Sequence, residues 1–181
     1  MLLLLLSISS QFLVITVESP DGEKVTVNAP KKCVESALLY AKEREEGAFK
    51  INDEEISADS ILMLLNQAEV NNEPILEVEK DGEFVRFWVR EASDVVDKTG
   101  RPKKLIINVE EKDESPVHIR LPLWIVRIIP SFIIATGEDA KDIRMARRLI
   151  KDVISEVRKM DGGFTLVEVI DKDERVKIEF D

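Results

Sequence analysis

The residues of this chain best suited to chemistry are one histidine, one cysteine and many carboxylates. His118 is the only histidine and Cys33 the only cysteine among 181 residues. A nucleophilic site needs its thiol or hydroxyl within hydrogen-bond reach of a base. His118 falls on the polar side of a strand-like segment, whereas Cys33 falls in an apolar slot, so the pattern does not pair them. The G-x-S-x-G turn of serine hydrolases is absent too. We therefore expect no catalytic centre at either residue.

The carboxylates are scattered, and their densest run resembles a calcium loop. Asp53, Glu55, Ser57 and Asp59 alternate as the first ligands of such a loop do. The loop glycine is missing, however, and helix-forming sequence follows too soon. We interpret the run as the start of a helix capped by Ser57 or Asp59. Phosphate-binding and dinucleotide-binding glycine motifs are absent as well. The sequence thus predicts no catalytic residue, no cofactor and no metal site.

Composition bounds the partners and the redox chemistry. The formal net charge is −10 and 44% of the residues are hydrophobic. A surface of this charge repels nucleic acid and anionic lipid over most of its area. A single cysteine excludes an internal disulfide and a cysteine-rich zinc site. We expect Cys33 to be a buried thiol that packs as a small hydrophobe.

The apolar start MLLLLLSISS lacks the basic segment of a signal peptide, and strand-like sequence follows at once. We treat residues 1–11 as a leader, with a disordered segment, a signal and an extension of the first strand all left open. No segment offers the roughly 20 apolar residues that a membrane-spanning helix needs. We expect a cytoplasmic protein, and export or surface association remains an alternative.

The chain also repeats itself. Residues 14–34 align without a gap with residues 106–126, and residues 76–89 align with residues 167–180. Two matching blocks in the same order indicate a duplicated unit of about 80 residues. The units that follow are repeat 1 at 12–90, a polar linker at 91–103 and repeat 2 at 104–181.

Each repeat reads as a β-hairpin, two helices and a second β-hairpin. Turn sequences such as Ser19-Pro20-Asp21-Gly22 separate strand-like segments, and Pro30 and Pro122 suit the start of a helix. The expected fold class is α+β, a tandem duplication of a ββααββ unit with antiparallel sheets and helices on one face. We expect the two copies to pack together about a pseudo-twofold axis.

Alternation in the closing hairpins assigns each side chain to one face of its strand. Six apolar side chains are expected to face the core, and four others, mostly charged, to face outward. The inward set is Val85, Phe87, Val89, Val176, Ile178 and Phe180, and the outward set is Arg86, Trp88, Lys177 and Glu179.

The segment at 121–135, LPLWIVRIIPSFIIA, is apolar almost all the way round a helix, with Arg127 as its one charge. Such a helix is buried on several sides. It is either a central core helix or a subunit or partner interface centred on Trp124, because aromatic anchors are enriched at interfaces. We expect burial of Trp124, Ile125, Ile128 and Ile129. Trp88, between two arginines, is a further candidate for an interface or a cation–π contact.

Basic side chains line one face of the last predicted helix at helical spacing. This stripe is either a solvated face paired with neighbouring acids or a surface for an anion or an acidic partner. Its members are Lys141, Arg144, Arg148, Lys151 and Arg158.

The closing hairpins, "LEVEKDGEFVRFWV" and "LVEVIDKDERVKIEF", and the stretch "VHIRLPLWIVRIIPSFI" resemble a group of uncharacterised bacterial proteins. Those proteins accompany SHOCT-like helical modules and adhesin-type modules. The resemblance covers most of repeat 2 and, more weakly, repeat 1. It implies a bacterial source and no particular activity, cofactor or site residue.

Our leading hypothesis is a non-enzymatic bacterial module that assembles with itself or with another protein. One alternative is an enzyme or small-ligand-binding protein with a cleft between the two repeats, since such clefts are good ligand sites. A second alternative is a regulatory binder of anions or nucleic acid that uses the basic stripe, although the net charge makes nucleic acid an unfavourable partner.

Overall fold

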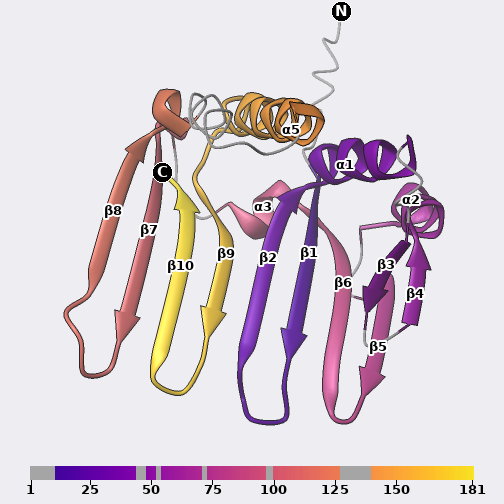
Figure 1. The fold of residues 1–181 in the computed structure, drawn as a ribbon, viewed down its shortest axis with the longest axis horizontal. Helices are drawn as coiled ribbons and strands as arrows, with labels where there is room; N and C mark the ends of the chain where they lie inside the picture. The colour runs from indigo at the N-terminus through magenta and orange to yellow at the C-terminus, as the bar shows by residue number, and fades with distance from the viewer. Residues whose placement is uncertain (1–10, 44–47, 52–53, 71–72, 97–99, 127–139) are drawn as a thin grey trace, which may run out of the picture.

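A computed structural model describes residues 11–43, 48–51, 54–70, 73–96, 100–126 and 140–181. Eight strands form one antiparallel sheet in the order β5-β6-β1-β2-β9-β10-β7-β8, with every hairpin turn at the same end (Figure 1). The class is α+β, as expected. Its strands are β1 (Gln11–Glu18), β2 (Lys24–Pro30), β5 (Leu76–Lys80), β6 (Glu83–Glu91), β7 (Lys104–Glu111), β8 (Val117–Pro122), β9 (Phe164–Ile170) and β10 (Glu174–Phe180).

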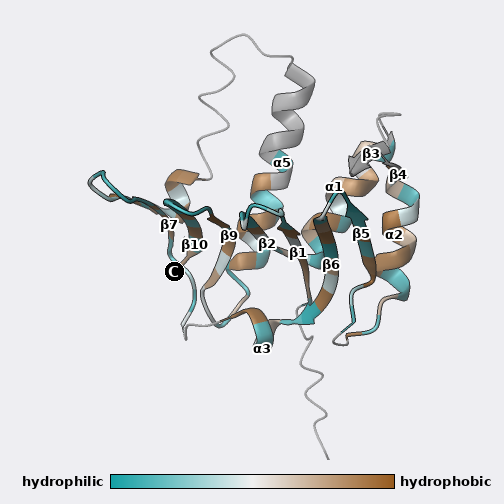
Figure 2. Ribbon diagram, turned by 90° about the horizontal axis from the view of Figure 1, so that it is seen from below, coloured by the Kyte–Doolittle hydropathy of each residue, from teal (hydrophilic) through white to brown (hydrophobic). Residues whose placement is uncertain are grey.

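Three helices lie on one face of this sheet and a short fourth lies on the other (Figure 2). The three are gathered at the end of the sheet away from the hairpin turns (Figure 1). Residues 123–126 form a helical turn directly after β8. The named helices are α1 (Lys31–Glu43), α2 (Ala58–Gln67) and α5 (Ala140–Val157) on the covered face, and α3 (Ala92–Val95) on the other face.

Local sequence explains several of these boundaries. Asp81 and Gly82 have φ values of 53° and 82°, as the two-residue turn between β5 and β6 requires. Pro30 ends β2 and α1 begins at the next residue. Ser57 caps α2, because its side chain accepts a hydrogen bond from the backbone N–H of Ser60.

Three short elements were not predicted. A small antiparallel pair, β3 (Ala48–Ile51) and β4 (Glu54–Ser57), lies between α1 and α2. The predicted linker contains α3, and Val96 after it makes an isolated bridge to Phe164. The run that resembled a calcium loop therefore ends in a strand and the cap of α2.

The core has two clusters. The first joins Leu13, Val85, Phe87 and Val89 of the sheet to residues of α1 and α2. The second is aromatic: the Phe12 ring meets the Phe164 ring edge-on with centroids 4.9 Å apart, and Phe180 packs beside them. Helical residues close both clusters, with Met160 just after α5 added to the second. They are Leu38, Ala58, Ile61 and Leu65 in the first cluster and Leu123 and Val157 in the second.

The expected pseudo-twofold axis is wrong. A twofold axis through the sheet would reverse the strand order from one half to the other. Instead β5-β6-β1-β2 is followed by β9-β10-β7-β8, and β2 pairs directly with β9. The halves therefore follow one another head to tail along a single sheet.

The predicted faces of the closing hairpins are confirmed for most residues. Val85, Phe87, Val89 and Phe180 are buried, whereas the neighbouring outward side chains are half-buried. Val176 and Ile178 share the apolar face but are only half-buried, because no described helix covers them.

Glu179 departs from the prediction, because only 8% of it is exposed. The pairing of β9 with β10 shifts its register between Ile178 and Glu179, and Glu179 lies opposite Ile106 of β7. Lys177 Nζ is 2.7 Å from Glu179 Oε2, so the buried carboxylate has a cation to offset its desolvation.

Leu65 and Met63 offer a test of this core. Both are apolar residues of α2, but Leu65 is 0% exposed and Met63 is 55% exposed. We expect Leu65→Ala to lower the free energy of unfolding by about 2–5 kcal/mol, because it opens a cavity between helix and sheet. Met63→Ala should change it by no more than about 0.5 kcal/mol. Denaturant unfolding of both variants measures the difference, and equal losses would contradict this packing.

Candidate functional site

No helix of the described part of the chain covers a large part of the sheet face that carries α1, α2 and α5 (Figure 1). Register places ten β-branched side chains side by side on this face of five neighbouring strands. All ten are half-buried or exposed, because the helices reach only one end of the sheet (Figure 1). We call this surface the apolar sheet face; it consists of Val25, Val27, Val167, Val169, Val176, Ile178, Ile107, Val109, Val117 and Ile119.

The apolar sheet face is most exposed where it meets the edge strand β8. There Val117 is 49% exposed and Ile119 is 43% exposed. Contiguous exposed apolar side chains mark interaction surfaces on soluble domains. The sequence showed that each strand has an apolar side, but it did not show that the described helices leave part of this side open.

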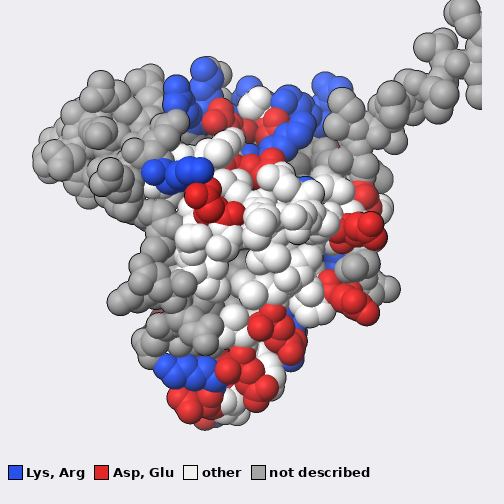
Figure 3. All heavy atoms as spheres, turned by 90° about the vertical axis from the view of Figure 1, so that its right-hand side faces the viewer, with Lys and Arg blue, Asp and Glu red and all other residues white. Residues whose placement is uncertain are grey.

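The two edges of the sheet differ in charge. On β8, Val117 and Ile119 point to the apolar sheet face. The next side chains along the strand, His118 and Arg120, point to the other face and are exposed. On β5 the corresponding positions hold two acids, Glu77 and Glu79. Figure 3 looks onto the β5 side and shows a broad uncharged area between basic side chains at the helix end and mostly acidic ones at the turn end.

Glu77 is fixed by a neighbouring cation. Arg86 Nε lies 2.5 Å from Glu77 Oε2, and Arg86 also reaches Glu18. The hydrogen bond that Arg86 donates to Glu77 is the main cause that raises the pKa of Arg86. The Arg86 guanidinium lies 4.7 Å from the centre of the Phe84 ring. The cation–π contact in this region thus uses Phe84, while Trp88 lies half-buried opposite Val14.

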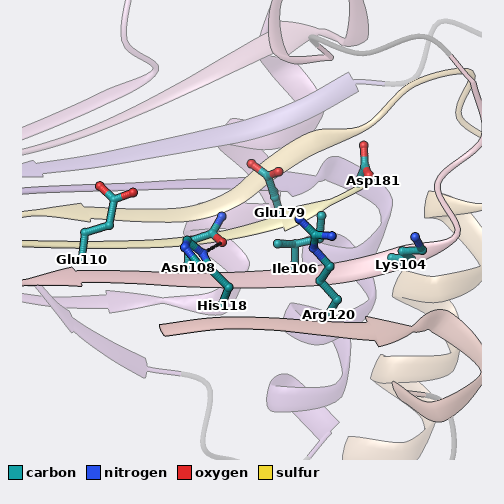
Figure 4. Close-up of a pocket in the computed structure, with 8 residues that line it drawn as sticks. All are labelled: Lys104, Ile106, Asn108, Glu110, His118, Arg120, Glu179 and Asp181. Atoms are coloured by element: carbon teal, nitrogen blue, oxygen red, sulfur yellow. Dashed lines mark hydrogen bonds between the residues drawn. The ribbon is translucent and has the colours of Figure 1, made fainter. Parts of the chain in front are cut away.

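A polar hollow of about 460 Å³ lies on the other face, over β7, β8 and β10 (Figure 4). His118 Nδ1 is 2.8 Å from Asn108 Oδ1, across the β7–β8 pair. Asn108 carries no charge, so it can orient the imidazole but cannot stabilise an imidazolium as the carboxylate of a catalytic triad does. The sequence missed the hollow because it depends on strand register; it is lined by Lys104, Ile106, Asn108, Glu110, His118, Arg120, Glu179 and Asp181.

A smaller hollow of about 370 Å³ lies where the two halves of the sheet meet, next to α3. Its carboxylates are Asp94 and Glu168, and Glu168 is paired with Arg175. The Asn28 side chain donates to the Thr165 carbonyl at 2.8 Å and so ties β2 to β9. One of the two carboxylates is already paired with a cation, so this hollow does not present the two free carboxylates that a cleft enzyme would use.

The structure tests part of the predicted interface helix. Trp124 is 60% exposed, so the expectation that it lies in the core of one chain is wrong. Leu123 takes the buried position at this turn, and Ile125 is half-buried. Ile128 and Ile129 lie outside the described residues. The alternative, in which Trp124 anchors a contact with another chain, stays a prediction.

The basic stripe is described at three of its five side chains. Arg148, Lys151 and Arg158 are exposed, and among the described residues we find no ion pair for them. Lys141 and Arg144 belong to the backbone of α5, but their side chains lie outside the described set. Glu156, an acid on the same helix as this stripe, pairs with Lys159 at 2.6 Å.

Comparisons of the chain with protein-family models, with curated proteins and with solved structures gave no match. Within the described ranges, no helix has the length and hydropathy to cross a membrane. The same ranges contain no group of three or more His, Cys, Asp or Glu side chains placed to hold a metal ion.

Cys33 is buried in the first turn of α1, as expected. Burial raises the pKa of its thiol to about 12, and the charges of Glu156 and Asp152 on α5 act in the same direction. We expect the folded chain to react very slowly with a thiol reagent at pH 8, because the thiolate is the reactive form. In guanidinium chloride one thiol per chain should react as fast as free cysteine. Equal rates in the folded and denatured chain would place Cys33 at the surface.

Proposed function

We propose that the protein is a non-enzymatic assembly module, which associates with copies of itself. The apolar sheet face is the observation that carries this proposal. Burying apolar area is the main drive for protein association, and this face combines a flat array of valine and isoleucine with an exposed tryptophan beyond its edge. The proposed location is the bacterial cytoplasm. Thiols stay reduced there, and the one cysteine of this chain is free and buried.

The proposal includes a tandem duplication of the strand and helix pattern. Its support is that both halves use one strand order and bury matching positions of their second helix. Leu65 of α2 and Val157 of α5 are both 0% exposed, and each helix leads into the third strand of its half. A unit that already binds a copy of itself within one chain is suited to bind further copies.

Ile119 and Ile170 provide a matched test. They are 43% and 40% exposed, but Ile119 belongs to the apolar sheet face and Ile170 points to the opposite face of its strand. We expect the full chain to form species heavier than 20.6 kDa. Ile119→Glu should return it to single chains, whereas Ile170→Glu should not, because a charge on the apolar sheet face must be desolvated on association.

Sedimentation velocity over a range of protein concentrations measures the masses, and thermal unfolding checks that both variants stay folded. A wild-type chain that remains single at every concentration would refute the proposed function. The proposed function would also be refuted if Ile119→Glu and Ile170→Glu formed species of the same mass.

A further inference from the structure

The pairing of β2 with β9 is a junction whose geometry could recur between the edge strands of two different chains. Four residue pairs, from Lys24 with Ile170 to Val27 with Val167, join the two halves of the chain. In the aligned repeats, β8 is the counterpart of β2, and β5 is the counterpart of β9. These two counterparts are the edge strands of the sheet that the described residues form.

We propose that β8 of one chain pairs with β5 of a second chain, and that this contact repeats the β2–β9 junction in a head-to-tail assembly. The inference rests on the proposed self-assembly and deepens it by naming the strands that meet. Because a head-to-tail contact leaves one free edge at each end, it produces an open chain of molecules rather than a closed pair.

The register of the β2–β9 pairing, which we call the inner junction, predicts which residues of β8 and β5 would lie opposite one another between two chains. Val25 lies opposite Val169 and Val27 opposite Val167. Their counterparts place Val117 opposite Val78, His118 opposite Glu77 and Ile119 opposite Leu76 of the next chain. The first and third pairs extend the apolar sheet face across the contact, and they cover the two most exposed side chains of that face.

The backbone of β8 is in phase with this register. Leu123 N–H donates to the Lys103 carbonyl at 2.9 Å, and hydrogen-bonded pairs recur at every second position of an antiparallel ladder. Hence the backbone groups that bond to β7 are those of Leu121, Ile119 and Val117. The backbone groups of His118 and Arg120 point away from β7, to the outer edge of β8.

The backbone of β5 matches it. In a two-residue hairpin the closing pair, here Lys80 and Glu83, is the hydrogen-bonded one. Counting back along the ladder, the backbone groups of Glu79 and Glu77 point away from β6. His118 and Glu77 would therefore form a hydrogen-bonded pair, as Thr26 and Glu168 do by the same counting at the inner junction.

Charge and sequence also favour this pairing over a symmetric one. Joining two β8 edges would bring His118 and Arg120 against their own copies, and joining two β5 edges would bring acids together. The β8–β5 contact instead sets His118 directly opposite Glu77, with Arg120 diagonal to Glu77 and Glu79 diagonal to His118. Pro116 precedes β8 and Pro122 is its last residue; neither offers an N–H, which limits the edge to a short, defined length.

The helices next to the inner junction also indicate where Trp124 would lie in the assembly. Cys33, in the first turn of α1 after β2, lies near Asp152 and Glu156 of α5, the helix that precedes β9. By the same arrangement, the helical turn after β8 would lie against the end of α2, the helix that precedes β5. A hollow of about 290 Å³ opens there, lined in part by Leu64, Ala68, Pro74 and Ile75, and could receive the Trp124 ring.

Two proline variants block one edge each. His118→Pro removes the outward N–H of β8, and Glu77→Pro removes an outward N–H of β5; proline is tolerated at such positions of an edge strand. We expect each variant alone to sediment as single chains, because assembly needs both edges. Mixed in equal amounts, they should form a two-chain species and nothing larger, because each supplies the edge that the other lacks.

Two further variants control for folding. His118→Gln keeps the N–H and should assemble like the wild type, while Glu79→Pro blocks β5 without removing the Glu77–Arg86 pair and should behave like Glu77→Pro. If the wild type assembles but both proline variants assemble equally well, the edge pairing is wrong and the proposed function stands. A mixture that stays single-chained also overturns the edge pairing. If the wild type never assembles, both proposals fail.

Discussion

The antiparallel pairing of β2 with β9 is the contact on which the rest of the molecule depends. It turns two four-stranded halves into one sheet with four residue pairs and the Asn28–Thr165 bond. The aromatic cluster needs it too, because Phe12 from the first half packs on Phe164 from the second. Each half alone would be close to the size at which a single core is marginal. The pairing is also far apart in sequence, so its loop-closure entropy must be overcome before it stabilises anything.

Local features of this fold were predictable from the sequence, and its global order was not. Turn residues, the Pro30 and Pro122 junctions and the alternation of Val85, Phe87 and Val89 act over a few residues, so they can be read directly. A twofold and a head-to-tail arrangement satisfy the same local pattern, and only the choice of partner for β2 separates them. β3, β4 and α3 were missed because four-residue elements carry too little periodicity to stand out.

The candidate surfaces show the same division. Alternation identified an apolar side on each strand, but whether Val117 or Val176 is covered depends on how far the helices reach. The polar hollow requires Asn108 and His118 to lie directly opposite one another, and a shift of one residue would separate them. Glu179 was assigned to the correct face, but a register shift and its neighbours bury it there. Trp124 follows a similar logic, because a sequence that is apolar all round does not reveal that Trp124 is the exposed side chain and Leu123 the buried one.

Charge sets a limit on how strongly such a module can associate. The net charge is −10, and the hairpin turns that carry many of the acids lie together at the end of the sheet away from the helices (Figure 1). Repulsion is already present inside one chain, where the charge of Glu114, and less so that of Glu174, raises the pKa of Glu111. Copies joined edge to edge would bring their turn ends to the same side and add to this repulsion, which salt screens. The short apolar pairs at the edge must outweigh it, so the contact should be reversible and sensitive to ionic strength rather than permanent.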